Sequence, residues 1–188
     1  MLYPKNKIVI KTKKIIPGFF ISTILLISIL SGCTDSSEKQ QGNAPNFTLT
    51  TIDGGRFTLS DHFGKIIVLD FMAAWCHYCT HQMKELEAVL EEKGDEILVV
   101  SIDVDKRETA DDIKNTFGEY IDKWVFALND YNENVEIKYK VYGIPKIVII
   151  DINGNIYYSM EGLTSRNKIL EEINKIEQEQ GGHTKNGQ

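Results

Sequence analysis

Alternating apolar and polar positions open the part of the chain that has a folding pattern. Residues 45–50 and 56–59 alternate on either side of Asp53-Gly54-Gly55, a sequence typical of a tight turn. A two-residue period places the apolar side chains on one face of a strand. The pattern therefore predicts an N-terminal β-hairpin.

Two continuous apolar runs follow, with a helical pattern between them. Residues 66–71 and 97–102 are typical of strands that are buried on both faces. From Cys76 to Lys93 the apolar residues recur at steps of three and four, and Gly94 ends the pattern, which predicts a helix. This order predicts a βαβ unit with a parallel strand pair, at the centre of an α/β fold.

The second half of the chain contains further helical and hairpin patterns. Thr109 and Asp112 predict a capped helix that runs towards Gly118, and a shorter helix is expected over residues 132–139. The remaining elements are a hairpin with strands at 147–150 and 156–158 around the turn Asn153-Gly154, and a final amphipathic helix that begins near Thr164 or Ser165.

The first 32 residues have the order of an export signal. Basic residues end at Lys14, and residues 15–30 are mostly Ile, Leu and Phe. This stretch of 16 residues is shorter than the roughly 20 that cross a bilayer comfortably, so cleavage is favoured over a permanent span. We therefore predict a signal peptide at residues 1–32.

Leu30-Ser31-Gly32-Cys33 ends this region and resembles the lipobox of prokaryotic lipoproteins, in which the cysteine is lipidated. The alternative is an uncleaved signal anchor in which Cys33 has no role. Either arrangement places the rest of the chain at the outer face of the cytoplasmic membrane. The expected parts are a lipidated cysteine and flexible linker at 33–44, a domain at 45–180 and a disordered tail at 181–188.

Charge separates this leader from the rest of the chain. The first 32 residues hold five of the 21 basic residues and no acidic residue, which leaves 16 basic against 27 acidic side chains downstream. Nucleic-acid binding requires clustered Lys and Arg, and no such cluster follows the leader. Nucleic acid is therefore excluded as a partner.

Cys76 and Cys79 stand where the first buried strand leads into a helix. The unpaired N–H groups and the positive dipole end of a helix N-terminus stabilise a thiolate, so we expect a lowered pKa for Cys76 and assign it as the nucleophile. Cys79, one turn further on, resolves the mixed disulfide. Their spacing on a helix brings the Cα atoms to roughly 5 Å, which a disulfide tolerates.

Two neighbouring residues are expected to influence this chemistry. Asp70 is a carboxylate within an apolar run, where burial raises its pKa and makes it a proton acceptor for Cys79, directly or through water. His77 lies between the cysteines, where a partly charged imidazole further favours the thiolate.

An inert structural disulfide and a zinc site are the alternatives for the cysteine pair. Zinc would need two more ligands, and His77 and His81 are nearby. Ligands drawn from one short helical turn cannot surround an ion tetrahedrally, so no metal is expected. A structural disulfide is disfavoured because such bonds rarely open a helix after a buried strand.

Three segments together resemble one known family. The chain is similar in three places to the TlpA/ResA-like branch of membrane-anchored thioredoxins. The first segment is residues 71–79, which contains Trp75-Cys76-His77-Tyr78-Cys79. The other two are Gly143-Ile144-Pro145 and Pro45-Asn46-Phe47. The similarity spans residues 44–176. It implies a thioredoxin fold, with a central mixed sheet flanked by helices, an N-terminal hairpin and an αβ-type insertion over residues 106–138.

The resemblance also implies a substrate-binding surface. In that family the proline is cis and faces the disulfide, which indicates Pro145. Ile144 would then offer backbone groups to an extended substrate segment, and Trp75 belongs to the same surface. A simple proline at the start of a strand is the alternative interpretation.

The chain departs from the family pattern at two places. Several members have a glutamate three residues beyond the second cysteine, where this chain has Gln82, so the acid–base role falls on Asp70. The Gly-Pro pair between the cysteines of reducing thioredoxins is replaced by His77-Tyr78. This change leaves the direction of electron flow open.

These observations predict an extracytoplasmic thiol-disulfide oxidoreductase with no cofactor beyond the Cys76–Cys79 disulfide. As the resemblance implies, it reduces disulfides of exported proteins, including the haem-binding cysteines of cytochromes, and receives electrons from a membrane partner. The alternatives are a disulfide oxidase or isomerase, and a lipoprotein of the same fold that binds a metal or a peptide. A peroxidase is disfavoured because the proline- and threonine-bearing loop before a peroxidatic cysteine is absent.

Overall fold

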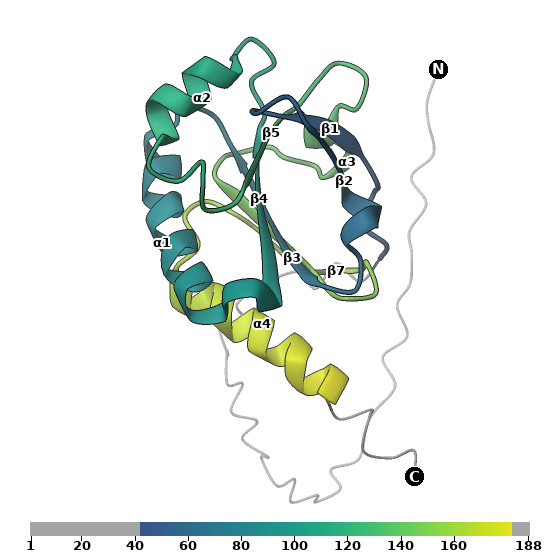
Figure 1. The fold of residues 1–188 in the computed structure, drawn as a ribbon. Helices are drawn as coiled ribbons and strands as arrows, with labels where there is room; N and C mark the ends of the chain where they lie inside the picture. The colour runs from purple at the N-terminus through teal and green to yellow at the C-terminus, as the bar shows by residue number, and fades with distance from the viewer. Residues whose placement is uncertain (1–41, 182–188) are drawn as a thin grey trace, which may run out of the picture. The chain divides into compact units, whose positions relative to one another are not determined.

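A computed structural model describes residues 42–181, which form one seven-stranded mixed sheet with four α-helices (Figure 1). The strand order is β2-β1-β5-β4-β3-β6-β7. The strands are β1 (Thr48–Thr51), β2 (Arg56–Thr58), β3 (Ile66–Met72), β4 (Ile97–Asp103), β5 (Val125–Leu128), β6 (Lys146–Ile150) and β7 (Ile156–Glu161). Strands β3, β4 and β5 run parallel, and the two hairpins join them in antiparallel orientation. The predicted βαβ unit and both hairpins are confirmed.

Local sequence signals explain where the helices begin and end. The helices are α1 (His77–Lys93), α2 (Ala110–Phe117), α3 (Val135–Lys138) and α4 (Arg166–Gly181), with short 3-10 turns at η1 (Leu59–His62) and η2 (Gly94–Glu96). Gly94 ends α1 with a φ of 53°, a conformation that favours glycine. Thr109 and Asp112 form a capping box at the start of α2, as the sequence predicts.

The two faces of the sheet carry separate apolar layers, and β3 contributes to both because its side chains alternate. Val68 and Met72 pack on the face covered by α1, α2 and α4. Leu69 and Phe71 pack on the opposite face, against the N-terminal hairpin and α3. Every residue of β3 is buried, so this strand forms the centre of the domain, and the cysteine pair follows directly from its end.

The sequence patterns did not locate β5. This strand has four residues and no clear turn signal beside it. Its position depends on pairing with distant segments, since Val125 lies opposite Val100 of β4 and Ala127 opposite Thr51 of β1. Through these pairs β5 joins the N-terminal hairpin to the central sheet, within the insertion that the family resemblance implies.

The helix expected over residues 132–139 is shorter than predicted. The Asp130 carboxylate accepts the N–H groups of Asn132 and Glu133, both at 2.8 Å. Asn134 then takes a left-handed backbone conformation with a φ of 46°. These contacts form a turn, so α3 begins only after Asn134. Leu59, expected at the end of a strand, instead begins η1 and remains buried.

Two residues of the segment that the sequence assigns to the linker, Gly42 and Ala44, pair with the β6–β7 turn. The Ile156 N–H donates to the Gly42 carbonyl at 2.9 Å, and the Ala44 N–H donates to the Gly154 carbonyl at 2.8 Å. These backbone contacts leave no trace in a hydrophobic pattern. The predicted signal peptide, Cys33, the linker up to residue 41 and tail residues 182–188 lie outside the described residues.

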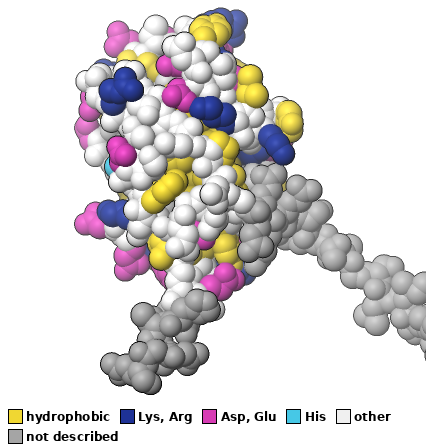
Figure 2. Space-filling view, turned by 90° about the vertical axis from the view of Figure 1, so that its right-hand side faces the viewer, with side chains coloured by type: hydrophobic (Ala, Val, Ile, Leu, Met, Phe, Trp, Pro, Cys, Tyr) yellow, Lys and Arg dark blue, Asp and Glu magenta, His cyan; other side chains and the backbone are white. Residues whose placement is uncertain are grey.

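The surface of the described domain carries charged and apolar side chains side by side. On the face shown in Figure 2, lysine and arginine side chains are interspersed with acidic ones, and apolar side chains form separate patches among them. Across residues 42–181, no helix combines the length and the apolar character needed to cross a membrane.

Candidate active site

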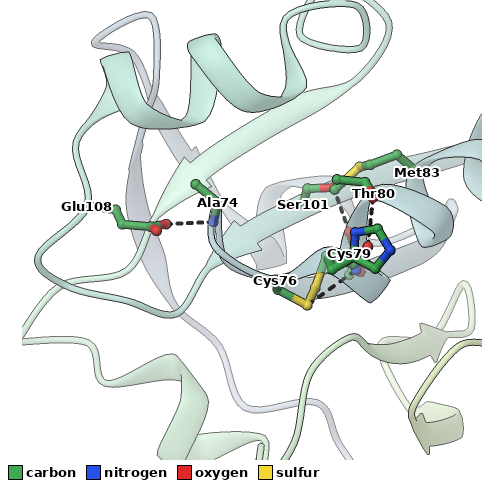
Figure 3. Close-up of a disulfide and its surroundings, with 9 residues drawn as sticks. Ala74, Cys76, Cys79, Thr80, Met83, Ser101 and Glu108 are labelled. Carbon is green, nitrogen blue, oxygen red and sulfur yellow. Dashed lines mark hydrogen bonds between the residues drawn. A yellow bond between two sulfur atoms is a disulfide. The ribbon is translucent and has the colours of Figure 1, made fainter.

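Cys76 and Cys79 are joined by a disulfide at the N-terminus of α1. Their Cα atoms are 5.3 Å apart, in agreement with the distance expected from helical spacing. Cys76 is the N-cap residue, and the Cys79 N–H donates to Cys76 Sγ at 3.2 Å (Figure 3). The structure therefore aims a helix N–H group at the sulfur that the sequence assigns as nucleophile. Cys76 is 5% exposed and Cys79 is fully buried, so an incoming substrate reaches Cys76 first.

Asp70 lies on β3 and is fully buried. The Ser101 hydroxyl donates to Asp70 Oδ2 at 3.0 Å, while Oδ1 has no hydrogen-bond partner among the described residues. Burial raises the pKa of Asp70 to about 7, and the Ser101 hydrogen bond opposes this rise. The expected upward shift is therefore present, and its cause is the one predicted.

The buried acid lies beneath the helix that carries the cysteines. Ser101 Oγ, which contacts Asp70, is also 4.0 Å from Met83 Sδ. Met83 stands four residues after Cys79 and therefore on the same face of α1. Asp70 is thus on the side of the sheet that Cys79 faces.

Gln82 has a structural contact that explains why this position carries an amide. Its side chain is fully buried and bonds twice to Thr164, donating to the carbonyl at 3.0 Å and accepting the N–H at 2.8 Å. A glutamate carboxylate could accept the N–H and could not donate to the carbonyl. Gln82 therefore links α1 to the loop before α4.

The Ile144–Pro145 peptide bond is cis, as the resemblance implies. Lys146, the next residue, lies opposite Phe71 near the end of β3, so the proline loop reaches the edge of the sheet where the disulfide is found. Ile144 and Trp75 line one cavity of about 350 Å³. Its other lining residues are Val104, Glu136, Val141, Tyr142 and Gly143. The structure thus brings the predicted substrate-binding residues together.

His77 and Tyr78 are exposed on the first turn of α1. The His77 ring packs edge-on against His81, with centroids 5.0 Å apart. Within residues 42–181, no group of three or more His, Cys, Asp or Glu side chains is arranged to hold a metal ion. The effect of His77 on the thiolate stays a prediction.

An acidic loop that the sequence analysis missed holds the segment before Cys76. Glu108 accepts the Ala74 N–H at 2.7 Å (Figure 3), and Asp105 accepts the Trp75 indole N–H at 3.0 Å. Behind them, burial raises the pKa of Asp103 to about 8, with a smaller contribution from the neighbouring negative charges of Glu108 and Asp105. These residues lie about thirty positions from the cysteines, so no local motif indicated them.

A buried lysine, also missed, holds the loop before Pro145. Lys146 Nζ donates to the carbonyls of Tyr139 at 3.0 Å and Lys140 at 2.8 Å, and it lies 3.6 Å from the Glu161 carboxylate. Glu161 in turn accepts the Tyr142 N–H at 2.8 Å. Burial lowers the pKa of Lys146. A polar residue at the start of the apolar run 147–150 was the available signal.

Fold and site together define a thioredoxin-like protein. A cysteine pair opens the helix after the central strand, and a cis-proline lies at the same edge of a mixed sheet. The model of the AhpC/TSA family matches residues 41–159. The chain therefore belongs to the AhpC/TSA family.

Individual relatives share the name of one enzyme class. The thiol-disulfide oxidoreductase ResA of Bacillus thuringiensis subsp. konkukian is 31% identical over 154 residues, covering 79% of this chain and 86% of the relative. ResA of Bacillus cereus is 29% identical over 167 residues, which are 81% of this chain and 94% of the relative.

The crystal structure of the thioredoxin domain of a Bacteroides vulgatus thiol-disulfide oxidoreductase superposes with a TM-score of 0.60 at 25% identity. The match covers 69% of this chain and 94% of that structure. The expected resemblance, fold and enzyme class are confirmed.

Proposed function

We propose that this protein works outside the cytoplasm and reduces disulfides of exported proteins through Cys76 and Cys79. The observation that carries the proposal is the disulfide at the N-terminus of α1, with a buried acid on the side that Cys79 faces. The names of the ResA relatives support the class of reaction. The predicted signal peptide at residues 1–32, followed by Cys33, supports the location.

The reaction begins with the reduced cysteine pair. The Cys76 thiolate attacks one sulfur of the substrate disulfide, forming a mixed disulfide and releasing one substrate thiolate. Cys79 passes its proton to Asp70, directly or through water, and attacks Cys76 Sγ. The Cys76–substrate bond breaks, the second substrate thiolate leaves, and the enzyme keeps the disulfide seen in the structure. Two electrons have passed to the substrate.

The buried Asp70 carboxyl supports the reducing direction. A strong oxidant is one whose reduced form is stabilised. A negative charge on Asp70 disfavours a further negative charge on Cys79 and so opposes that stabilisation. Each cycle then needs a dithiol partner that re-reduces the disulfide, and we propose a membrane protein for this role.

Insulin reduction by the purified protein, recycled by dithiothreitol, tests the activity. Wild type is expected to precipitate the insulin B chain well above the rate with dithiothreitol alone, whereas Cys76→Ser is expected to match that background. Equilibration with glutathione buffers then tests the direction. A potential close to those of strong oxidants, about −120 mV, would show that the protein is an oxidase instead.

Physiological substrates can be captured with Cys79→Ser. This variant keeps the attacking thiol and lacks the resolving one, so the mixed disulfide persists. Trapped cytochrome polypeptides would support a role in cytochrome maturation. If the trapped proteins are exported proteins without haem-binding cysteines, the reaction stands and this particular role does not.

A further inference from the structure

Two residues with no assigned part in the reaction form a buried hydrogen-bond chain that ends at Asp70. The Trp124 indole N–H donates to Ser101 Oγ at 3.0 Å, and the Ser101 hydroxyl donates to Asp70 Oδ2 at 3.0 Å. Ser101 lies on β4 and is fully buried, and Trp124 directly precedes β5 and is 8% exposed. All three polar groups are therefore removed from bulk water. In the protein interior a hydrogen bond is stronger than in water, and a polar group without a partner is costly.

The chemistry of the three groups determines which of them donates each hydrogen bond and which accepts it. An indole N–H can only donate, so Ser101 Oγ must accept from Trp124. The single hydroxyl hydrogen of Ser101 then has two neighbours, Asp70 Oδ2 at 3.0 Å and Met83 Sδ at 4.0 Å. A thioether is a weak acceptor, so the hydrogen points to the carboxylate. Oδ2 is thereby engaged, and a proton arriving at Asp70 goes to Oδ1, the buried oxygen with no partner among the described residues.

Asp70 is surrounded mainly by apolar side chains, and its polar contact is the hydrogen bond from Ser101. β4 contributes Ser101, and β6 contributes Ile147, which lies directly opposite Asp70 and packs in the same apolar layer. α1 contributes Met83, whose Sδ lies 4.0 Å from Ser101 Oγ, and Cys79, which belongs to the same apolar layer. Burial and the Ser101 hydrogen bond are the two influences on the pKa of Asp70, with no part from a charged side chain.

The next acidic residue on β4, Asp103, interacts with the loop that follows the strand and not with Asp70. Asp103 lies two residues beyond Ser101, and its Oδ1 accepts the Asp105 N–H at 2.9 Å. Its charge interactions are with Glu108 and Asp105, not with Asp70. A change in the titration of Asp70 can therefore be traced to Ser101 and Trp124.

We propose that Ser101 and Trp124 are positioning residues for proton transfer: together they hold Asp70 so that Oδ1 receives the proton from Cys79. The inference rests on the proposed function, since it concerns the step in which Cys79 resolves the mixed disulfide. Ser101 acts on Asp70 directly, and Trp124 acts through Ser101 by occupying its acceptor site.

The two half-reactions can be followed separately with the aromatic disulfide probe 5,5′-dithiobis(2-nitrobenzoate). Attack by Cys76 releases one thionitrobenzoate ion, and resolution by Cys79 releases a second. The rate of the second release is measured against pH for wild type, Ser101→Ala, Trp124→Phe and the double variant. In parallel, the infrared band of the protonated Asp70 carboxyl is assigned by its loss in Asp70→Asn and titrated in each protein.

Two midpoints are compared between the proteins: that of the second release against pH, and that of the Asp70 infrared band. Ser101→Ala removes the bond that stabilises the carboxylate, so both midpoints rise by about one pH unit. Trp124→Phe keeps an aromatic ring and loses the N–H, so it shifts both midpoints in the same direction by a smaller amount. In the Ser101→Ala background, Trp124→Phe has no further effect. Ser101→Thr retains a hydroxyl and restores the wild-type midpoints.

Ser60→Ala is the matched control. It removes a serine hydroxyl that accepts from Asn46 at 3.0 Å on the η1 turn, whose Leu59 packs on the face of the sheet opposite Asp70. Its midpoints are expected to equal those of wild type. If Ser101→Ala also leaves both midpoints unchanged, or if Trp124→Phe shifts them equally with and without Ser101, the proposal is wrong.

Two further outcomes are distinguishable. If Ser101→Ala fails to fold by near-ultraviolet circular dichroism, Trp124→Phe and Ser101→Thr decide: an unshifted Trp124→Phe variant overturns the proposal. If wild type releases no second thionitrobenzoate ion and leaves insulin intact, the proposed function itself fails. A wild type that shows both releases, with variants that do not shift, leaves the function standing and removes Ser101 and Trp124 from it.

Discussion

At the scale of single residues, Asp70 is the group whose removal separates the two halves of the reaction. Asp70→Asn keeps the shape of the side chain and cannot take up the Cys79 proton. Because general-base catalysis contributes about 100-fold or more, the second thionitrobenzoate release is expected to slow by that order, with the first nearly unchanged. Stopped-flow absorbance resolves both phases. Equal slowing of both phases would remove Asp70 from the mechanism.

Asp70 also makes stability depend on pH. Its folded pKa of about 7 lies above the ordinary value of 3.8, so the folded state binds more protons than the unfolded state between these values. The free energy of unfolding therefore falls as pH rises from about 4 to 7, by an order of 3 kcal/mol for this group. Asp70→Asn is expected to remove this contribution. Urea unfolding of the oxidised proteins at pH 5 and pH 8 measures it.

The wild-type minus Asp70→Asn difference is the informative quantity, because Asp103 titrates in both proteins. Asp53→Asn is a suitable control, since Asp53 is an exposed acid whose pKa is lowered mainly by the Thr51 hydroxyl. If the Asp70→Asn difference is the same at both pH values, Asp70 does not titrate between pH 5 and pH 8, which contradicts a folded pKa of about 7.

The residues that the sequence made predictable share one property: their signal is local. A polar Asp70 in an apolar run and two cysteines at a strand–helix junction stand out without any knowledge of tertiary contacts. Ser101 carries a similar signal, since it interrupts the run 97–102. Its link to Trp124, like that of Glu108 to Ala74, joins positions that meet only after the sheet has formed.

At the scale of elements, the clamp between Gln82 and Thr164 holds α1 against the loop that leads into α4. Gln82→Glu is expected to lower the free energy of unfolding by about 1–3 kcal/mol at neutral pH, because a buried carboxylate faces the Thr164 carbonyl without a hydrogen to donate. Burial raises the pKa of such a glutamate, so the deficit shrinks as pH falls and the carboxyl regains a hydrogen. Denaturant titration at pH 5 and pH 8 checks both effects.

Gln178→Glu on the exposed side of α4 makes the same chemical change without burial. It is expected to leave the free energy of unfolding within about 0.5 kcal/mol of wild type. A Gln82→Glu variant as stable as this control would show that the clamp is not required.

Elements with strong periodicity were predictable, and those fixed by pairing were not. The helix α1 follows from its apolar spacing and from Gly94, and β3 and β4 follow from continuous apolar runs. The strand β5 is too short to show a period, and its identity depends on neighbours on both sides. α3 is shortened by side-chain contacts of Asp130, which compete with the helix.

At the scale of the whole molecule, the proposed attachment to the membrane depends on Cys33, which lies outside the described residues. Cys33→Ala is expected to move the protein from the membrane fraction to the soluble exported fraction, because the acylated residue is lost. Insulin reduction by the variant should match wild type, since Cys33 has no part in the exchange. Immunoblots of the separated fractions measure the change.

An uncleaved signal anchor predicts a different result. The apolar residues 15–30 would then hold Cys33→Ala in the membrane as firmly as wild type, at the mass of the uncleaved chain. Mass spectrometry of the N-terminus separates the two cases. Retention of Cys33→Ala at full length would show that Cys33 is not the anchor.

The contacts of Gly42 and Ala44 determine from which end a tether would hold the domain. They join the β6–β7 turn, at the end of the sheet where β3 begins, whereas the disulfide follows the last residue of β3. Seven residues of strand, at about 3.3 Å each, separate these ends by roughly 20 Å. If the chain is lipidated at Cys33, as proposed, the tether enters the domain at the end of the sheet opposite the disulfide. Lengthening the tether would extend the reach of the thiols without altering their reactivity.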